Sequence, residues 1–300
     1  MALERVRPES ADLRLRKSYT RAIVILIGGN AALGLIKGLL AWTTGSSAIF
    51  SDAANSFADT LYSILMGIGL YLSQKPADIS HPQGHSRFDP LIAMLVTAAM
   101  AGSGITALYE SVQRLLGDAR TFALPLPTMV LIAAGLIKVA MYRSIHQIGK
   151  ETGSPALHAG AQDNLMDTLT TASAMIGIWG ARHLHPAVDP AAGIVVALWI
   201  FRTTWGVGRQ SLDYLTGRGA GQEVIGEIID RARGVPGVRT VHRVIADYVG
   251  PKLRVEIHVG VDSLLTLEHA HGIAEEVEER VKTLPSVDLV FVHLDPARKT

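Results

Sequence analysis

The chain has 300 residues, of which 48% are hydrophobic and only 18% are charged, and its net charge is +1 at pH 7. Soluble domains carry about a quarter charged residues, so this composition favours a protein with a large apolar part. The small net charge argues against a nucleic-acid-binding protein, and the absence of cysteine excludes disulfides, thiolate zinc sites and iron–sulfur clusters.

Six stretches before about residue 210 are long and apolar enough to cross a bilayer, which takes about 20 mostly apolar residues. We therefore expect an all-α six-helix transmembrane bundle over residues 21–211, after a polar N-terminal tail of residues 1–20. The fourth stretch, which contains TMVLIAAGLIKVAMY, is typical of a helix that faces lipid. The six predicted spans are 21–42, 47–73, 89–115, 123–147, 156–183 and 187–211.

Basic residues predict the orientation of this bundle. The 1–2 turn has no Lys or Arg, and the 3–4 and 5–6 turns have Arg114, Arg120 and Arg182. Positive charge favours the cytoplasmic side, so we expect an integral protein of a prokaryotic inner membrane with both termini in the cytoplasm. The basic residues of the tail and of the 2–3 and 4–5 connections are Arg5, Arg7, Arg14, Arg16, Lys17, Lys75, Arg87, Arg143 and Lys150.

From about Gly219 the hydrophobic period changes to that of a small soluble domain. QEVIGEIIDRARG predicts an amphipathic helix, and TLEHAHGIAEEVEERVKTL predicts a second one. Residues 238–247, residues 253–262 and the segment VDLVFVHLDP alternate like strands, and Gly250-Pro251 marks a turn between the first two. The order αββαβ predicts an α+β domain over residues 212–300, with helices on one face of a sheet.

Four polar residues lie in the middle of the second and fifth spans, in two pairs with the same spacing. Residues four apart lie on one face of a helix, so each pair faces one way. The two faces together predict a cage of four oxygen ligands for a divalent cation. We call this set the membrane quartet, and it consists of Asn55, Asp59, Asp163 and Asp167.

The three carboxylates of the membrane quartet are costly within lipid. Each charge at the bilayer centre costs about 2.5–3.5 kcal/mol on insertion scales. Neither of their two spans has a Lys or Arg at matching depth, and Lys37 and Lys138 of the first and fourth spans are the nearest cations. A polar clamp between helices and a proton relay without metal are the alternatives to a metal site.

Five motifs in order resemble the cation diffusion facilitator family: GSSAIFSDAANSFAD, HPQGHSRFDP, ALHAGAQDNLMD, VDPAAG and VHLDP. The resemblance covers nearly the whole chain. It implies a homodimer that exports divalent metal from the cytoplasm in exchange for protons. It also implies six spans, a ferredoxin-like (metallochaperone-like) αββαβ cytoplasmic domain, and a transport site at the positions of the membrane quartet.

The membrane quartet contains no histidine, whereas zinc exporters of this family typically have at least one there. Oxygen ligands suit Mn²⁺ or Fe²⁺ better than Zn²⁺, which favours imidazole and thiolate. The N-x-x-x-D and D-x-x-x-D pairs resemble the manganese-type branch of the family. We expect Mn²⁺ as the cargo, with Fe²⁺ and Zn²⁺ as alternatives because zinc also binds carboxylates strongly.

Two further groups of residues outside the spans are candidate metal ligands. Asp78, His81 and His85 lie in the 2–3 connection, where the resemblance places a secondary metal site; the alternative is a solvated loop that caps the third helix. In the C-terminal domain the resemblance places regulatory metal ligands, which would form a two-metal cluster at a dimer interface. These five positions are His242, His258, His271, His293 and Asp295.

The sequence predicts a transporter rather than an enzyme. No G-x-x-x-x-G-K-[ST] loop is present for an ATP-driven pump, and no H-E-x-x-H is present for a metalloprotease. The expected partners are metal ions, protons, the bilayer and a second copy of the chain, with no nucleic acid. The alternative function is a membrane-anchored metal sensor or scaffold that does not transport.

Overall fold

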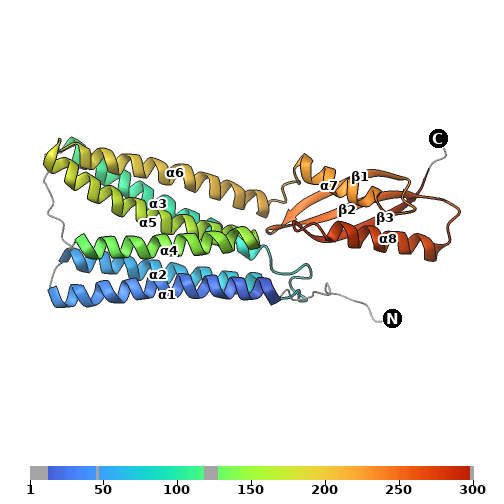
Figure 1. The fold of residues 1–300 in the computed structure, drawn as a ribbon, viewed down its shortest axis with the longest axis horizontal. Coiled ribbons are helices and arrows are strands. Elements are labelled where there is room, and N and C mark those ends of the chain that lie inside the picture. Colours follow the sequence, from blue (N-terminus) through green and yellow to red (C-terminus); the bar gives the residue numbers. More distant parts are fainter. Residues whose placement is uncertain (1–12, 45–46, 118–127, 298–300) are drawn as a thin grey trace. The chain divides into compact units, whose positions relative to one another are not determined.

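The computed structural model describes residues 13–44, 47–117 and 128–297. The chain divides into two compact units between Leu212 and Asp213, which we call the helical unit and the C-terminal unit. Six long helices make up the described part of the helical unit (Figure 1). Their bounds are α1 Leu13–Thr44, α2 Ser47–Ser73, α3 Phe88–Leu116, α4 Thr128–Thr152, α5 Pro155–His183 and α6 Val188–Leu215.

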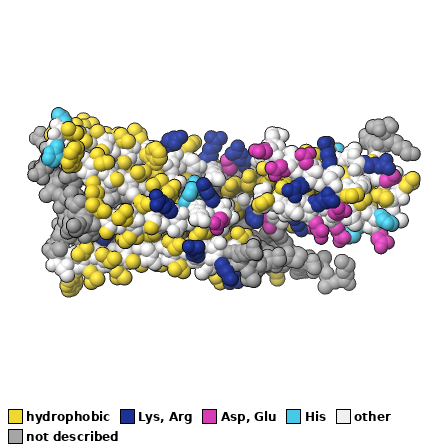
Figure 2. Space-filling view, viewed as in Figure 1, with side chains coloured by type: hydrophobic (Ala, Val, Ile, Leu, Met, Phe, Trp, Pro, Cys, Tyr) yellow, Lys and Arg dark blue, Asp and Glu magenta, His cyan; other side chains and the backbone are white. Residues whose placement is uncertain are grey.

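The helical unit carries its apolar side chains outward as well as inward. Trp42 and Trp205 are 89% and 73% exposed, and Figure 2 shows hydrophobic side chains over the visible face of these helices. Three segments of the described chain are long and apolar enough to cross a membrane: Leu15–Thr43, Phe88–Leu116 and Val188–Leu215. Helices α2, α4 and α5, also predicted as spans, lie outside this set. The polar groups gathered among these three helices are described below.

The prediction of a lipid-facing fourth helix holds for one side of α4 only, where Ile132, Leu136 and Ile137 are exposed. Helix α4 packs against α5 and α1, and it buries Met141, Ile145, Ile148 and the charged Lys138. The apolar run does not distinguish the buried side of α4 from its outward side, because a helix buried in a membrane bundle is as hydrophobic as a lipid-facing one. Its predicted first residues, 123–127, lie outside the described residues.

A short turn sets the register of α4 against α5. Gly153 has φ +70, a conformation that glycine adopts without strain and that commonly ends helices. Ser154 then caps α5, because its hydroxyl accepts a hydrogen bond from Leu157 N at 3.1 Å. Pro155 occupies the first position of α5, where its missing N–H costs nothing. The two helices therefore form an antiparallel hairpin.

A buried carboxylate joins three helices at the same end of the bundle. Asp89 in the first turn of α3 is 1% exposed. One of its oxygens accepts hydrogen bonds from Ser154 Oγ at 2.9 Å and from Ala156 N at 2.8 Å, and the other accepts from Tyr19 Oη at 3.0 Å. Asp89 thus links α3 to the start of α5 and to α1.

The C-terminal unit confirms the predicted αββαβ order. Helices α7 (Gln222–Arg233) and α8 (Leu267–Lys282) pack on one face of a sheet in the order β1-β2-β3. Strand β2 pairs antiparallel with β1 and parallel with β3, and the other face of the sheet is not covered by these helices. Alternate β2 residues, such as Val255 and Ile257, enter the core. The strands are β1 Thr240–Val249, β2 Lys252–Val261 and β3 Val287–Pro296.

We expect Asp89→Ala to destabilise the helical unit by about 3 kcal/mol, because it leaves several buried donors without an acceptor. Tyr19→Phe removes one of these donors and should cost about 1 kcal/mol. Thermal unfolding of the full-length protein in detergent measures both effects. An Asp89→Ala variant as stable as the Tyr19→Phe variant would contradict the role given to Asp89.

Candidate functional site

The carboxylates of the membrane quartet approach one another around a lysine. Lys138 Nζ of α4 lies 3.1 Å from Asp59 Oδ2 of α2 and 2.6 Å from Asp167 Oδ2 of α5. Asp163, one turn before Asp167, also interacts electrostatically with Lys138. The lysine side chain is almost fully buried, whereas Asp59 and Asp167 are partly exposed. Two of the three acids therefore pair directly with one ammonium group, and the third interacts with it over a longer distance.

Asn55 stands apart from this arrangement. It is exposed on α2, and no described hydrogen bond or ion pair joins it to the three acids. The ligand oxygens of Asp59, Asp163 and Asp167 also do not lie within 4.8 Å of one another as a set in the described chain. The structure thus gathers the acids without closing a cage, and metal binding by the membrane quartet stays a prediction.

Small and polar residues allow the helices of this site to come close together. A Cβ atom on Gly160 of α5 would lie 2.7 Å from Met66 Cε of α2, so a larger residue there would force the end of the Met66 side chain to move. Asn30 of α1 donates to Ser63 Oγ of α2 at 2.7 Å, and Ser63 donates to the carbonyl of Asp59 at 2.8 Å. The backbone that carries Asp59 is therefore held from α1.

The sequence reasoning missed Lys138 as a member of the site. The signal was present: a single lysine in the middle of an apolar stretch must have a partner, and an intramembrane charge marks a functional site by default. The partner was not readable, because the stretch itself contains no acid and the pairing depends on how α4 packs against α2 and α5.

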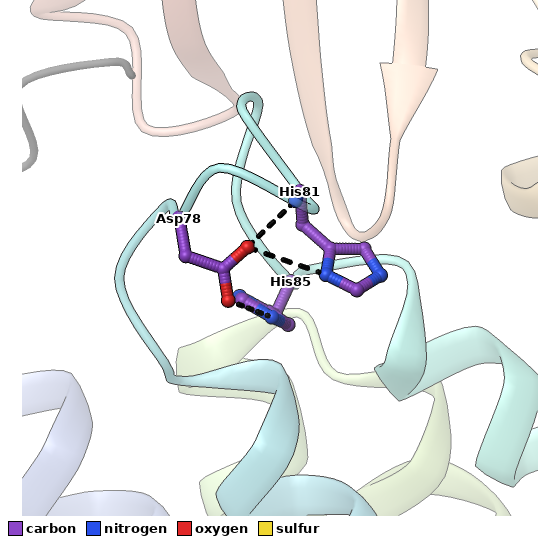
Figure 3. Close-up of side chains that lie close together, drawn as sticks. All are labelled: Asp78, His81 and His85. Carbon is purple, nitrogen blue, oxygen red and sulfur yellow. Dashed lines mark hydrogen bonds and ion pairs between the residues drawn. The ribbon is translucent and has the colours of Figure 1, made fainter. Parts of the chain in front are cut away.

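The structure brings the three loop residues together between α2 and α3 (Figure 3). Asp78 Oδ1 lies 3.5 Å from His81 Nδ1, and Asp78 Oδ2 lies 3.4 Å from His85 Nε2. The other ring nitrogen of His85 lies 3.1 Å from Pro76 O, which holds this buried ring in place. One carboxylate and two imidazoles facing one another form a donor set that suits a divalent transition metal.

The electrostatics of the loop favour an ionised Asp78. The backbone N–H of His81 donates to Asp78 Oδ1 at 2.7 Å, and this bond is the main cause that holds the pKa of Asp78 below its usual value. The Coulombic effect of His85 lowers the pKa of Asp78 further, whereas partial desolvation raises it. The alternative of a helix cap gains no support, because α3 begins after Arg87 without a side-chain cap bond.

The structure also brings together four of the five C-terminal candidates, on the sheet face opposite to α7 and α8. Asp295 Oδ2 lies 2.9 Å from His242 Nε2 and 3.3 Å from His258 Nδ1, and Asp295 Oδ1 lies 3.5 Å from His293 Nε2. His258 and His293 are register partners on β2 and β3. We call His242, His258, His293 and Asp295 the sheet cluster.

A β-bulge helps to assemble the sheet cluster. The register of β1 against β2 shifts between Val241 and Arg243, so His242 is an extra residue on β1. A bulge re-aims the side chain it carries, and here His242 reaches over β2 to Asp295 on β3. Glu256 Oε1 lies 3.3 Å from His258 Nε2 and joins the cluster. The strand alternation that pairs 256 with 258 could have identified Glu256 from the sequence.

His271 does not join the sheet cluster within one chain. It lies on α8, on the other side of the sheet, where its Nε2 is 3.4 Å from Glu275 Oε1. A role for His271 in metal binding stays a prediction.

The sheet cluster keeps Asp295 ionised. Partial desolvation raises the pKa of Asp295, but the hydrogen bonds from His258 and His242 and the Coulombic effects of His293 and His242 outweigh it, so the pKa lies below its usual value. An ionised carboxylate among three imidazoles is ready to share a metal ion with them once the rings are neutral.

Comparisons with known proteins match both units of the chain. The family model described as the cation efflux transmembrane domain matches residues 23–216. A second model, described as the cytoplasmic domain of cation efflux proteins, matches residues 220–297. The two matches meet close to the point where the structure divides into its helical and C-terminal units.

Individual relatives extend over nearly the full chain. An uncharacterised transporter of Methanocaldococcus jannaschii is 31% identical, over 93% of this chain and 99% of the relative. The manganese efflux system protein MneS of Bacillus subtilis is 27% identical, over 94% and 97%. The magnetosome protein MamM of Paramagnetospirillum magneticum is 33% identical, over 84% and 80%. A solved cadmium form of a MamM C-terminal domain variant is 33% identical over 26% of this chain and 98% of that chain, with a TM-score of 0.25.

We expect His258→Ala to weaken metal binding at the sheet cluster by about tenfold or more, because it removes the ring in the middle of the cluster. His269→Ala is the matched control and should leave this affinity unchanged, because His269 is an exposed residue of α8 outside the five candidate positions. Calorimetric titration of the full-length protein with Zn²⁺ measures both. Equal losses in the two variants would show that the metal site is built differently from the sheet cluster.

Proposed function

The chain belongs to the cation efflux family, and on this premise we propose that it exports Mn²⁺ from the cytoplasm in exchange for protons, with Fe²⁺ and Zn²⁺ as alternative cargo. It is an integral membrane transporter of divalent metal cations, and its C-terminal unit is the family's cytoplasmic domain. The proposal concerns the metal, the coupling ion and the residues that form the path.

One observation carries the assignment of the site. Acidic residues from two helices, α2 and α5, face a common point in the middle of an otherwise apolar bundle. Ionised groups at such depth are costly and are kept where ions or protons pass. The membrane quartet is therefore proposed as the transport site, with Asn55 as the fourth oxygen ligand when the site closes around a metal.

The donor chemistry supports manganese. The membrane quartet offers oxygen atoms only, and hard oxygen donors suit Mn²⁺ better than they suit Zn²⁺. The relative MneS is named as a manganese efflux protein, and it aligns with nearly the whole chain. Oxygen ligands do not reject zinc by affinity alone, so zinc and iron remain alternative cargo.

Competition for the same oxygens supports proton coupling. A carboxylate must be ionised to bind a metal, so metal arrival releases protons and metal departure allows protons to bind. With the site facing the two sides of the membrane in turn, this competition exchanges metal for protons. We place the N-terminus and the C-terminal unit in the cytoplasm of a prokaryotic cell and propose no enzymatic activity.

We further propose that the C-terminal unit joins two copies of the chain and senses metal through the sheet cluster. This cluster is the observation behind the rival function, a membrane-anchored sensor or scaffold that does not transport. Such a sensor would have no use for three acids within an apolar bundle. Flux measurements on variants of these acids separate the two functions.

We expect Asp163→Asn to reduce Mn²⁺ flux into proteoliposomes driven by a pH gradient by about tenfold or more, because the lost charge weakens metal binding. Asp163 is chosen because the two close ion pairs of Lys138 are with Asp59 and Asp167. Its substitution therefore removes one acid and leaves both ion pairs in place. Asp59→Ala should abolish flux as well.

The control for these variants is Glu110→Gln, which neutralises an exposed acid of α3 that pairs with Arg114. Its flux should equal that of the unaltered protein. Unchanged flux in both Asp163→Asn and Asp59→Ala would defeat the assignment of the transport site. Absence of flux in the unaltered protein with Mn²⁺, Fe²⁺ and Zn²⁺ would favour the sensor.

We expect Asn55→His to shift the selectivity from Mn²⁺ towards Zn²⁺ by about tenfold, because an imidazole ligand favours zinc over manganese. Competition flux assays with both metals present measure this ratio. Thr60→His is the control on the same helix, outside the membrane quartet. A selectivity ratio that stays the same in Asn55→His would show that Asn55 does not contact the metal.

A further inference from the structure

The lysine among the acids of the membrane quartet suggests a role beyond balancing charge. Lys138 is 6% exposed and is the one Lys or Arg of α4 that lies in its apolar middle rather than its last turns. Its ammonium group bridges an oxygen of α2 and an oxygen of α5, at 3.1 and 2.6 Å. A buried ammonium with two carboxylates is stabilised in its charged form.

The two oxygens that Lys138 occupies belong to proposed metal ligands. A metal bound by carboxylates lies about 2.0–2.2 Å from their oxygens, close to where the ammonium group now sits. A metal ion and an ammonium group so close together repel each other strongly in a medium of low dielectric constant. Metal and ammonium therefore compete for Asp59 and Asp167.

We propose that Lys138 is a tethered competitor of the metal: its ammonium group holds the ligand carboxylates while the site is empty and must withdraw before a divalent cation binds. This inference rests on the proposed transport function of the same site. Its consequence is that Lys138 weakens metal binding and helps the metal to leave, because the ammonium group is always at hand to replace it.

The charges around Lys138 fit a divalent cargo. When all three carboxylates are ionised, they carry three negative charges and the lysine carries one positive charge, so the formal charge of the site without metal is −2. One divalent cation cancels this charge. The lysine remains in the bundle after it withdraws, so the loaded site is neutral as a whole and no charge is left unpaired in lipid.

The test removes the charge of Lys138 and measures metal affinity. Lys138→Met keeps the length of the side chain, and Lys138→Gln keeps a donor for the carboxylates should the first variant fold poorly. We expect both to bind Mn²⁺ about tenfold more tightly, since a neighbouring charge shifts such equilibria by about one to three powers of ten. In proteoliposomes the KM for Mn²⁺ and the maximal rate should both fall, because the metal loses the group that displaces it.

The titration uses the full-length protein in nanodiscs, with Asp78→Ala and His258→Ala in the background to silence the loop and the sheet cluster. Lys150→Gln, an exposed lysine in the last turn of the same helix, is the control and should leave the affinity unchanged. Lys138→Arg keeps the positive charge, and its affinity for Mn²⁺ should lie within about threefold of that of the unaltered protein.

A lysine that only holds the helices together predicts the opposite result, because its loss would distort the site and weaken Mn²⁺ binding. Unchanged or weaker binding in Lys138→Gln, in a folded protein that still binds Mn²⁺, overturns the inference. Asp163→Asn in the same background tests the proposed function separately. If Asp163→Asn does not change Mn²⁺ binding, the assignment of the transport site is wrong. If Asp163→Asn abolishes Mn²⁺ binding but Lys138→Gln does not tighten it, only the role given to Lys138 is wrong.

Discussion

The helical unit depends on how charge is balanced within an apolar bundle. Three acids and one lysine meet in its middle, and the ammonium group binds the carboxylates of two helices. A charge without a partner in lipid costs a few kcal/mol, so these carboxylates need a cation or a proton at every moment. Under the proposed function this requirement would make transport an exchange, because a bound ion would leave the acids only when another positive charge takes its place.

The fold fixes the position of Lys138 relative to Asp167 more firmly than it fixes either residue relative to Asp59. Lys138 and Asp167 lie on the two arms of the α4–α5 hairpin, about equally far from Gly153, and the cap at Ser154 and the carboxylate of Asp89 fix the end of that hairpin. Asp59 lies on α2, which is held from α1. A shift of α2 relative to the hairpin changes the distance from Lys138 to Asp59 and leaves its distance to Asp167 unchanged.

Much of this organisation could be read from the sequence, since hydrophobic length and period depend on local chemistry. These signals give six helices, the αββαβ order, and the placing of Asp59, Asp163 and Asp167 on two helices. The role of α4 could not be read, because burial in protein and burial in lipid select the same residues. The reach of His242 to Asp295 was equally hidden, because it depends on a bulge in β1 that leaves no clear mark in the sequence.

The membrane quartet and the sheet cluster share one physical feature despite their different donors. In each place the candidate ligands already have partners in the protein: Asp59 and Asp167 bind an ammonium group, and Asp295 binds the rings of His242 and His258. A metal that enters must replace these partners, so its observed affinity is the difference between two binding energies. Internal partners therefore raise the metal concentration at which either place would fill.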